Sequence, residues 1–218
     1  MKKRLTKFAQ VAGIMLALAF TFSCSGSDDN NNGCVVGSGS TFKDDRDGKS
    51  YKSVKIGEQT WMAENLNYRG SEPDTLGSCY DNNPANCTTY GRLYGRTEAK
   101  EAACPSGWHL PDTTEWNTLI KTVGGSSTAG TKLKSKCGWN DYEGTSGNGT
   151  DDFGFFALPS GYYMDGRFRK IGETTYWWSS SNYGGNNVTS YLGIHYKYGS
   201  SEWGASTGLL SVRCIQGN

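Results

Sequence analysis

The stretch Cys104-Pro-Ser-Gly-Trp-His-Leu-Pro-Asp-Thr-Thr-Glu-Trp-Asn-Thr-Leu-Ile-Lys-Thr-Val-Gly-Gly125 contains the clearest helix signal of the 218-residue chain. Asp112 can cap a helix, and Glu115 three residues later completes a capping box. Apolar residues then recur at the three- to four-residue spacing of a buried helix face, at Trp116, Leu119, Ile120 and Val123. Because Gly124-Gly125 ends this pattern, the sequence predicts a helix from Asp112 to Val123.

Strand signals lie on both sides of this helix. Short strands are expected over residues 51–56, 59–66, 161–164, 167–171, 175–180, 188–196 and 209–215. Gly57-Glu58 and Asp165-Gly166 separate the first two pairs, as in β-hairpins. A second, short helix is expected over Thr97–Ala103, before Pro105. Strands at both ends with helices between them predict an α+β fold with short antiparallel strands and two helices.

The N-terminus has the pattern of an export signal. A basic head (Lys2, Lys3, Arg4 and Lys7) precedes an apolar run from Val11 to Phe22. This run is shorter than a membrane span, which needs about 20 apolar residues. Ser23-Cys24 resembles a bacterial lipobox, so residues 1–23 are expected to be a lipoprotein signal peptide and Cys24 the lipidated residue. The lipid bilayer is then a partner through the Cys24 anchor.

The remainder of the chain divides into a tether and one domain. Residues 24–40, rich in Ser, Gly, Asp and Asn, cannot bury apolar surface and are expected to form a flexible tether. Residues 41–218 have the size of a single domain. Without the four basic residues of the head, 18 Lys and Arg stand against 21 Asp and Glu, a net charge of −3. This balance gives no basic footprint for nucleic acid.

Seven cysteines favour an oxidising compartment. If Cys24 carries lipid, six remain, and an even number in an exported chain is typical of disulfides. Cys79 and Cys87 are the favoured local pair. Cys104 with Cys214 could tie the middle of the chain to its end, which would leave Cys34 with Cys137; the other pairings that six cysteines allow stay open. Neither a Cys-x-x-Cys motif nor a histidine at zinc-like spacing is present, so zinc is not expected.

A set of short motifs runs through the domain in a fixed order. The motifs are Asp44-Asp-Arg-Asp-Gly-Lys-Ser-Tyr51, Val54-Lys-Ile-Gly57, Gln59-Thr-Trp-Met-Ala-Glu-Asn-Leu66, Tyr90-Gly-Arg-Leu-Tyr94, Cys104-Pro-Ser-Gly-Trp-His-Leu-Pro111, Phe153-Gly-Phe-Phe-Ala-Leu-Pro159, Tyr176-Trp-Trp-Ser-Ser180 and Ser211-Val-Arg-Cys214. Together they closely resemble the Fibrobacter succinogenes major paralogous domain family, over about Thr41 to Ile215. That resemblance implies an exported, often lipid-anchored protein.

Two further resemblances bear on fold and location. The motifs over 104–116 and 211–214 resemble C-type-lectin-like and formylglycine-generating-enzyme-like folds, which implies a disulfide-stapled, C-type-lectin-like mixed fold, although a fold does not determine a function. Ser25-Gly-Ser-Asp-Asp29 resembles the acidic export signal of surface lipoproteins in the Bacteroidota. It implies the outer membrane of the cell envelope, and an ordinary acidic linker is the alternative.

Aromatic residues crowd the last third of the chain. In alternating strands about half of them should face away from the core, and exposed Tyr and Trp suit carbohydrate or protein surfaces. Adjacent strand residues point to opposite faces, so one of Trp177 and Trp178 is expected to be buried and the other exposed. The candidate ligand-binding residues are Trp177, Trp178, Tyr183 and Trp203.

Oxygen-bearing side chains gather in two loops. Asp44, Asp45 and Asp47 lack the twelfth-position glutamate of a calcium-binding hand and are expected to form a β-turn. A second group could hold one hard cation such as calcium, although a hydrated loop without a cofactor is the preferred interpretation; its members are Asn140, Asp141, Asp151 and Asp152. His109 lies in an apolar string and is expected to be a packed, hydrogen-bonded residue, so no catalytic residue is assigned.

The function expected is that of a non-catalytic binding module in a cell-envelope lipoprotein, with an extracellular glycan or a surface protein as its partner. Two other classes stay open. One is an enzyme, either a polysaccharide-active hydrolase or an oxidase that uses free cysteines as the formylglycine-generating fold does. The other is a structural envelope protein without a small ligand. No phosphate-binding loop of the type Gly-x-x-x-x-Gly-Lys-Ser/Thr is present.

Overall fold

A computed structural model describes residues 34, 36–37, 39–71, 75–101, 103–182, 189–198 and 201–217. The predicted signal peptide and Cys24 lie outside these residues, as does most of the predicted tether. No helix within the described ranges is long and apolar enough to cross a membrane.

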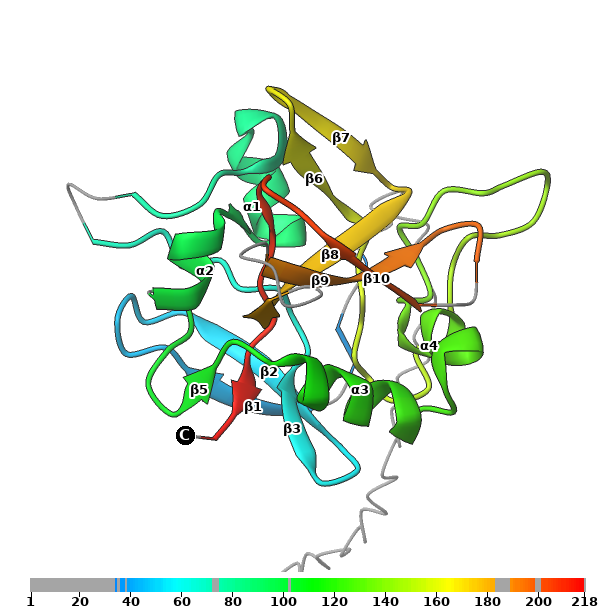
Figure 1. Cartoon of the computed structure of the whole chain (residues 1–218), viewed down its shortest axis with the longest axis horizontal. Helices are drawn as coiled ribbons and strands as arrows, with labels where there is room; N and C mark the ends of the chain where they lie inside the picture. The colour runs from blue at the N-terminus through cyan, green and yellow to red at the C-terminus, as the bar shows by residue number, and fades with distance from the viewer. Residues whose placement is uncertain are drawn as a thin grey trace, which may run out of the picture. The chain divides into compact units, whose positions relative to one another are not determined.

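The first sheet joins the beginning of the domain to its end. Its strand order is β1 (Ser40–Lys43), β2 (Ser50–Ile56), β3 (Gln59–Met62), β12 (Ile215–Gln216) and β5 (Trp108–His109). β2 and β3 form the hairpin that was predicted around Gly57-Glu58. Ile215 pairs with Trp61 on one side and with His109 on the other. The last strand therefore lies between segments that are far apart in the chain, as Figure 1 shows for the red C-terminal segment.

The second sheet is built around the longest strand. Its order is β10 (Ser201–Ala205), β9 (Thr189–His195), β8 (Thr174–Asn182), β11 (Leu210–Ser211) and β4 (Leu93–Tyr94), and β6 (Ser160–Met164) connects β8 to β7 (Arg167–Ile171). β6 and β11 run parallel to β8, and the other pairs are antiparallel. Asp165 and Gly166 form the predicted β6–β7 turn, both with positive φ (51° and 74°), which glycine adopts without strain.

Four α-helices are present in the described part of the chain: α1 (Pro84–Tyr90), α2 (Arg96–Glu101), α3 (Thr113–Thr122) and α4 (Ser126–Leu133), with a short 3-10 helix η1 (Tyr80–Asn82) before α1. The capping box predicted for α3 is confirmed: Asp112 Oδ1 accepts from Glu115 N at 2.8 Å, and Glu115 Oε2 accepts from Asp112 N at 2.9 Å. The α+β class is therefore confirmed, but the number of two helices was wrong. α1 has no apolar stripe, and α4 carries Gly130 in its interior, where glycine is unfavourable.

The predicted strand over 209–215 was also wrong in its extent. The chain leaves the second sheet after Ser211 and joins the first sheet at Ile215. Between them, the carbonyls of Val212 and Cys214 accept hydrogen bonds from Leu66 N (2.9 Å) and Met62 N (3.0 Å). This crossing connects the two sheets, a tertiary feature that local periodicity cannot reveal.

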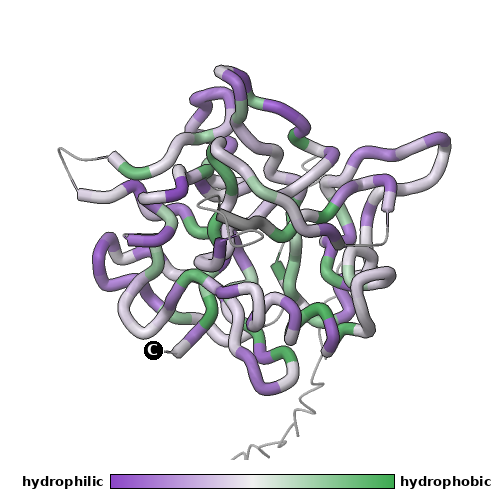
Figure 2. Tube along the Cα trace, viewed as in Figure 1, coloured by the Kyte–Doolittle hydropathy of each residue, from purple (hydrophilic) through white to green (hydrophobic). Residues whose placement is uncertain are grey.

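Two hydrophobic clusters form the core on opposite sides of β8. Trp177 belongs to the cluster that includes Trp61 and Trp116, whereas Trp178 belongs to the cluster that includes Tyr94 and Met62. In Figure 2 the peripheral loops are mostly purple or white, while green segments lie on the central strands. β8 is therefore covered on both faces.

Three disulfides cross-link the described cysteines, in the pairs favoured from sequence: Cys34–Cys137, Cys79–Cys87 and Cys104–Cys214. The Cys34–Cys137 disulfide places the start of the domain at Cys34, before the predicted start at residue 41. Lys52 Nζ donates to the carbonyls of Val36 (2.8 Å) and Gly37 (2.9 Å), and β1 already begins at Ser40. Residues from Cys34 onward thus belong to the domain, and the tether predicted to reach residue 40 was too long.

Candidate functional site

Arg213 lies at the centre of a buried polar network. Its Nε and Nη2 donate to Asn65 Oδ1 at 3.1 and 2.8 Å, and its Nη1 donates to the carbonyls of Met62 and Phe155. The guanidinium carbon lies 4.5 Å from the ring centroid of Phe155. Burial lowers the pKa of Arg213 to about 9. Oxygen acceptors and an aromatic face surround this cation, which is only 1% exposed.

Asn65 extends the network toward both sheets. Its Oδ1 also accepts from Trp177 Nε1 at 2.8 Å, and a chain of hydroxyl groups continues from Ser211 to Ser160 and Thr175 with 2.8 Å contacts. Apart from Ser160 and Thr175, the members of the network come from four of the sequence motifs: 59–66, 153–159, 176–180 and 211–214. Because these side chains are buried, the network organises the core and presents no surface to a ligand.

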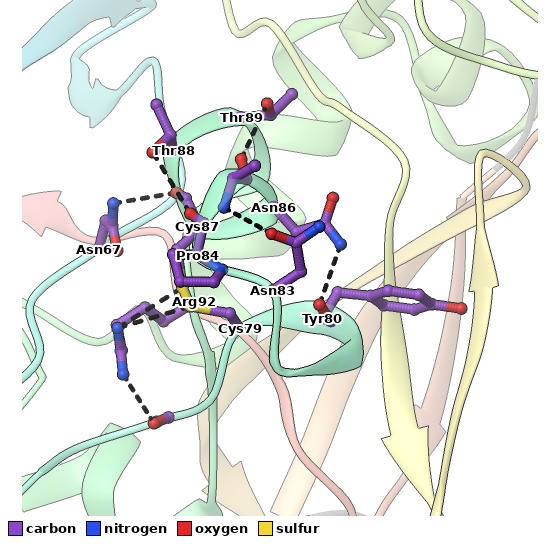
Figure 3. Close-up of a disulfide and its surroundings, with 12 residues drawn as sticks. Asn67, Cys79, Tyr80, Asn83, Pro84, Asn86, Cys87, Thr88, Thr89 and Arg92 are labelled. Carbon is purple, nitrogen blue, oxygen red and sulfur yellow. Dashed lines mark hydrogen bonds between the residues drawn. A yellow bond between two sulfur atoms is a disulfide. The ribbon is translucent and has the colours of Figure 1, made fainter.

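Arg92 performs a similar structural task at the Cys79–Cys87 disulfide. Its Nη1 lies 3.7 Å from Cys79 Sγ and 3.5 Å from Cys87 Sγ, and its Nε donates to Leu76 O at 2.9 Å. Asn67 Nδ2 donates to Cys87 O at 2.9 Å. Figure 3 shows the Arg92 side chain beside the bridge and Asn67 hydrogen-bonded to Cys87. The loop is held by internal contacts.

The four aromatic candidates differ in position. Trp177 and Trp178 are both 0% exposed, so neither can contact a ligand at the surface, and the prediction that one is exposed was wrong. The alternation itself holds, but the second face of β8 meets the second hydrophobic cluster instead of solvent. Tyr183 lies outside the described residues. Trp203 is half-buried and packs against the first cluster.

Trp203 borders a groove of about 680 Å³ between α3, the turn that follows it, and β10. The groove is lined by Asn117, Ile120, Lys121, Gly124, Gly125, Ser126, Glu202 and Trp203. Asn117 and Lys121 are four residues apart and so share one face of α3. Gly124 and Gly125 have positive φ (107° and 93°), which glycine adopts without strain and which lets the chain reverse into α4.

The groove combines a ring surface with polar groups. The indole of Trp203 offers a flat apolar surface beside an amide (Asn117), a carboxylate (Glu202) and an ammonium group (Lys121). Its volume lies within the about 300–1,000 Å³ typical of small-ligand sites. Such a set can stack on a sugar ring and hydrogen-bond its hydroxyl groups. The sequence pointed only to Trp203, because the other three are ordinary exposed residues that meet only when α3 packs beside β10.

Three of the four candidate calcium ligands, Asp141, Asp151 and Asp152, do not form a group that could hold a metal ion. Asn140 N donates to Gly172 O at 2.8 Å, whereas Asp152 N donates to Lys132 O at 3.0 Å. Asp151 Oδ1 accepts from Phe156 N at 2.8 Å, and Asp141 is exposed. In the part of the chain that the structure describes, no three His, Cys, Asp or Glu side chains form a group that could hold a metal ion.

Two other polar residues that the sequence singled out are engaged in local contacts. Asp44 is buried and accepts from Arg46 Nη2 at 2.7 Å within the β1–β2 turn. His109 Nε2 lies 2.8 Å from Glu115 Oε1, and its Nδ1 lies 3.1 Å from Gly217 O. Burial acts to lower the pKa of His109, but its hydrogen bonds to Glu115 and Gly217 raise the pKa above 6.5.

These features define a disulfide-stapled α+β domain whose two sheets meet at a buried arginine and whose surface carries a groove beside Trp203. The chain matches the Fibrobacter succinogenes major domain over residues 54–216, and it belongs to this family. The matched segment includes the Arg213 network and every residue that lines the groove. No curated protein and no solved structure matches the chain.

Proposed function

We propose that this chain is a lipid-anchored protein of the bacterial cell envelope whose domain binds an extracellular polysaccharide in the groove between α3 and β10. Trp203 carries the proposal, because it packs against the first hydrophobic cluster and also lines the groove. An aromatic ring that is held in place loses little conformational entropy when it binds a ligand. The lipid anchor at Cys24 and a place at the outer membrane rest on the N-terminal sequence pattern.

The chemistry of the groove favours a sugar over the other partners. Glu202 and Lys121 carry opposite charges and, with Asn117, can serve hydroxyl groups as both acceptors and donors. A surface protein is the second candidate partner, but a concave site of this size suits a chain of sugar rings better than a flat protein surface. The three disulfides agree with an exported protein.

The proposed domain binds its ligand and does not catalyse a reaction. An oxidase of the formylglycine-generating kind needs free cysteines, whereas all six cysteines from Cys34 to Cys214 are paired. A C-type-lectin-like architecture is also part of the proposal. It is supported by the internal position of the last strand, β12, between β3 and β5 in the first sheet and by the Cys104–Cys214 bridge.

A glycan array with residues 25–218 tests the binding function. The fragment starts before Cys34 so that the Cys34–Cys137 bridge is kept. We expect the wild type to bind a polysaccharide and the Trp203→Ala variant to lose it. Trp108→Ala is the matched control, because Trp108 is also half-buried but stacks on Phe42, with 4.2 Å between ring centroids. Retained binding by Trp203→Ala, or no bound glycan at all, contradicts the proposal.

Membrane fractionation tests the anchor separately. The full chain should be found in the membrane fraction, and Cys24→Ala should release it or stall its processing. Equal membrane association of both forms contradicts lipidation at Cys24.

A further inference from the structure

A cluster of tyrosines with one lysine lies where the loop after Cys137 meets the end of β9. We call Tyr142, Tyr196, Lys197 and Tyr198 the tyrosine patch. The rings of Tyr142 and Tyr196 pack edge to face with centroids 5.6 Å apart, and Lys197 Nζ lies 4.0 Å from the centroid of Tyr142. Tyr198 is 59% exposed, a high value for a large hydrophobic side chain among the described residues.

A buried lysine, Lys134, holds the backbone of the tyrosine patch through hydrogen bonds. Lys134 is 3% exposed, and its Nζ donates to Tyr196 O at 3.3 Å and to Tyr198 O at 3.5 Å. The same Nζ lies 5.2 Å from the ring of Trp139. Tyr196 N donates to Glu173 O at 2.7 Å, and Tyr198 N donates to His195 O at 3.3 Å. The backbone that displays the patch is thus fixed before any partner arrives.

The patch lies close to the point where the N-terminal segment enters the domain. The Cys34–Cys137 disulfide fixes that entry point. Tyr142 follows Cys137 by five residues, so their Cα atoms are at most about 18 Å apart. A domain of this length has a diameter of about 40 Å. The entry point and the patch therefore belong to one face.

The length of chain before Cys34 restricts how that face can move. Ten residue steps separate Cys24 from Cys34, which at full extension span at most about 36 Å. This span is shorter than the domain diameter of about 40 Å. A domain anchored at Cys24 therefore keeps the face around Cys34 turned toward the bilayer more often than the opposite face.

We propose that the tyrosine patch rests on the phospholipid headgroups of the membrane that anchors the chain, an inference that relies on the proposed anchor. Tyrosine suits the headgroup region because its ring is apolar and its hydroxyl group is polar. The exposed charges around the patch are mixed, with Lys136 and Lys197 against Asp141 and Glu143. This balance favours zwitterionic headgroups such as phosphatidylethanolamine, whose ammonium group can lie over a tyrosine ring and whose phosphate can meet Lys197.

The groove proposed for glycans stays free in this arrangement. Ser126 at the start of α4 lines the groove, whereas Lys134, which supports the patch, directly follows the end of the same helix. The two surfaces share no residue. A domain that rests on the bilayer through the patch can therefore bind a polysaccharide at the same time.

Hydroxyl-radical footprinting of tyrosines tests the inference. The full chain is recovered from membranes and reconstituted in phosphatidylethanolamine–phosphatidylcholine vesicles. The reference is soluble residues 25–218, which contain all three disulfides and both hydrophobic clusters and the whole compact unit from Cys34. We expect Tyr198 to lose most of its labelling in the vesicles. Tyr163 of β6, half-buried in the other hairpin, should label equally in both samples.

The mass of the N-terminal peptide, measured on the same vesicles, separates this inference from the proposed anchor. Lipid on Cys24 with unchanged labelling of Tyr198 overturns the inference and leaves the anchor intact. A protected Tyr198 in a membrane-bound chain without lipid on Cys24 overturns the anchor and leaves the patch intact. A chain that is absent from the membrane fraction overturns both.

Discussion

At the scale of single residues, Arg213 shows how one side chain can hold two sheets together. It sits in the segment that crosses from β11 to β12, and its guanidinium reaches Asn65 and the carbonyls of Met62 and Phe155. A lysine has one compact ammonium group and could not reproduce this fork of donors. The planar shape of the arginine is therefore what the site requires.

Arg213→Met should destabilise the domain by about 3 kcal/mol or more, because several buried oxygen atoms lose their donor and each costs about 1–3 kcal/mol. The measurement is the urea midpoint of residues 25–218. Arg167→Met is the matched control, since Arg167 is exposed on β7, and should change stability by less than about 0.5 kcal/mol. An unchanged midpoint for Arg213→Met would show that the network does not hold the core.

Trp177→Ala and Trp178→Ala should each cost about 3–5 kcal/mol, because both remove a fully buried ring and leave a cavity. The two losses should be similar, since each ring fills one of the two hydrophobic clusters. Urea unfolding of the two variants checks this. A variant with wild-type stability would mean that one ring faces solvent after all.

This tryptophan pair also shows where reasoning from sequence stops at the residue scale. Alternation along a strand correctly places Trp177 and Trp178 on opposite faces. Whether the second face meets solvent depends on segments distant in the chain, here those that carry Tyr94 and Met62. Trp203 could be predicted as a site residue because it is a tryptophan in an aromatic-rich segment. Asn117, Lys121 and Glu202 could not be predicted, because they meet Trp203 only when α3 packs beside β10.

At the scale of elements, α3 is a helix whose two ends can be predicted from local sequence signals. The capping box of Asp112 and Glu115 and the stop at Gly124-Gly125 are local signals, as are the two hairpin turns, and the structure has all of them. The two-residue strands β4 and β5 have no such signal, because they form through pairing with the distant strands β11 and β12. α1 and α4 were missed for a related reason, since tertiary contacts outweigh their weak propensity.

His109 links β5 to α3 and gives this region a dependence on pH. Its folded pKa lies above 6.5, so folding favours the protonated ring. The stabilisation is complete below the unfolded pKa and is lost as the pH rises through the folded pKa. His195 has the opposite behaviour, because burial lowers its pKa below 6.5.

The chain has two histidines, so an NMR titration of their ring protons can resolve both. His109 should titrate above 6.5 and His195 below it. Glu115→Gln should lower the midpoint of His109 and leave that of His195 unchanged. Two midpoints that coincide near 6.5 would contradict the hydrogen bonds assigned to His109.

At the scale of the whole molecule, the disulfides differ in the length of chain that they close. Cys104–Cys214 spans 110 residues and Cys79–Cys87 spans 8. In the chain-entropy model the long loop contributes about 5 kcal/mol and the short loop about 2–3 kcal/mol. The long bridge also joins the segment before β5 to the segment before β12, which are neighbours in the first sheet.

Cys104→Ser/Cys214→Ser should therefore lower the unfolding free energy more than Cys79→Ser/Cys87→Ser. Denaturant unfolding of both double variants, with the remaining bridges confirmed by peptide mapping, measures the difference. Equal losses, or a larger loss for the short loop, would show that Arg92 and its neighbours make the Cys79–Cys87 loop more important than its length suggests.

The central claim, a glycan site at Trp203, is tested most directly by NMR of the indole N–H groups. Five of the seven tryptophans are at most 4% exposed, and only Trp108 and Trp203 are half-buried. When an oligosaccharide from the array is titrated into residues 25–218, the Trp203 resonance, assigned with Trp203→Phe, should shift and saturate while that of Trp108 stays in place. Binding that leaves the Trp203 resonance unmoved would contradict the account.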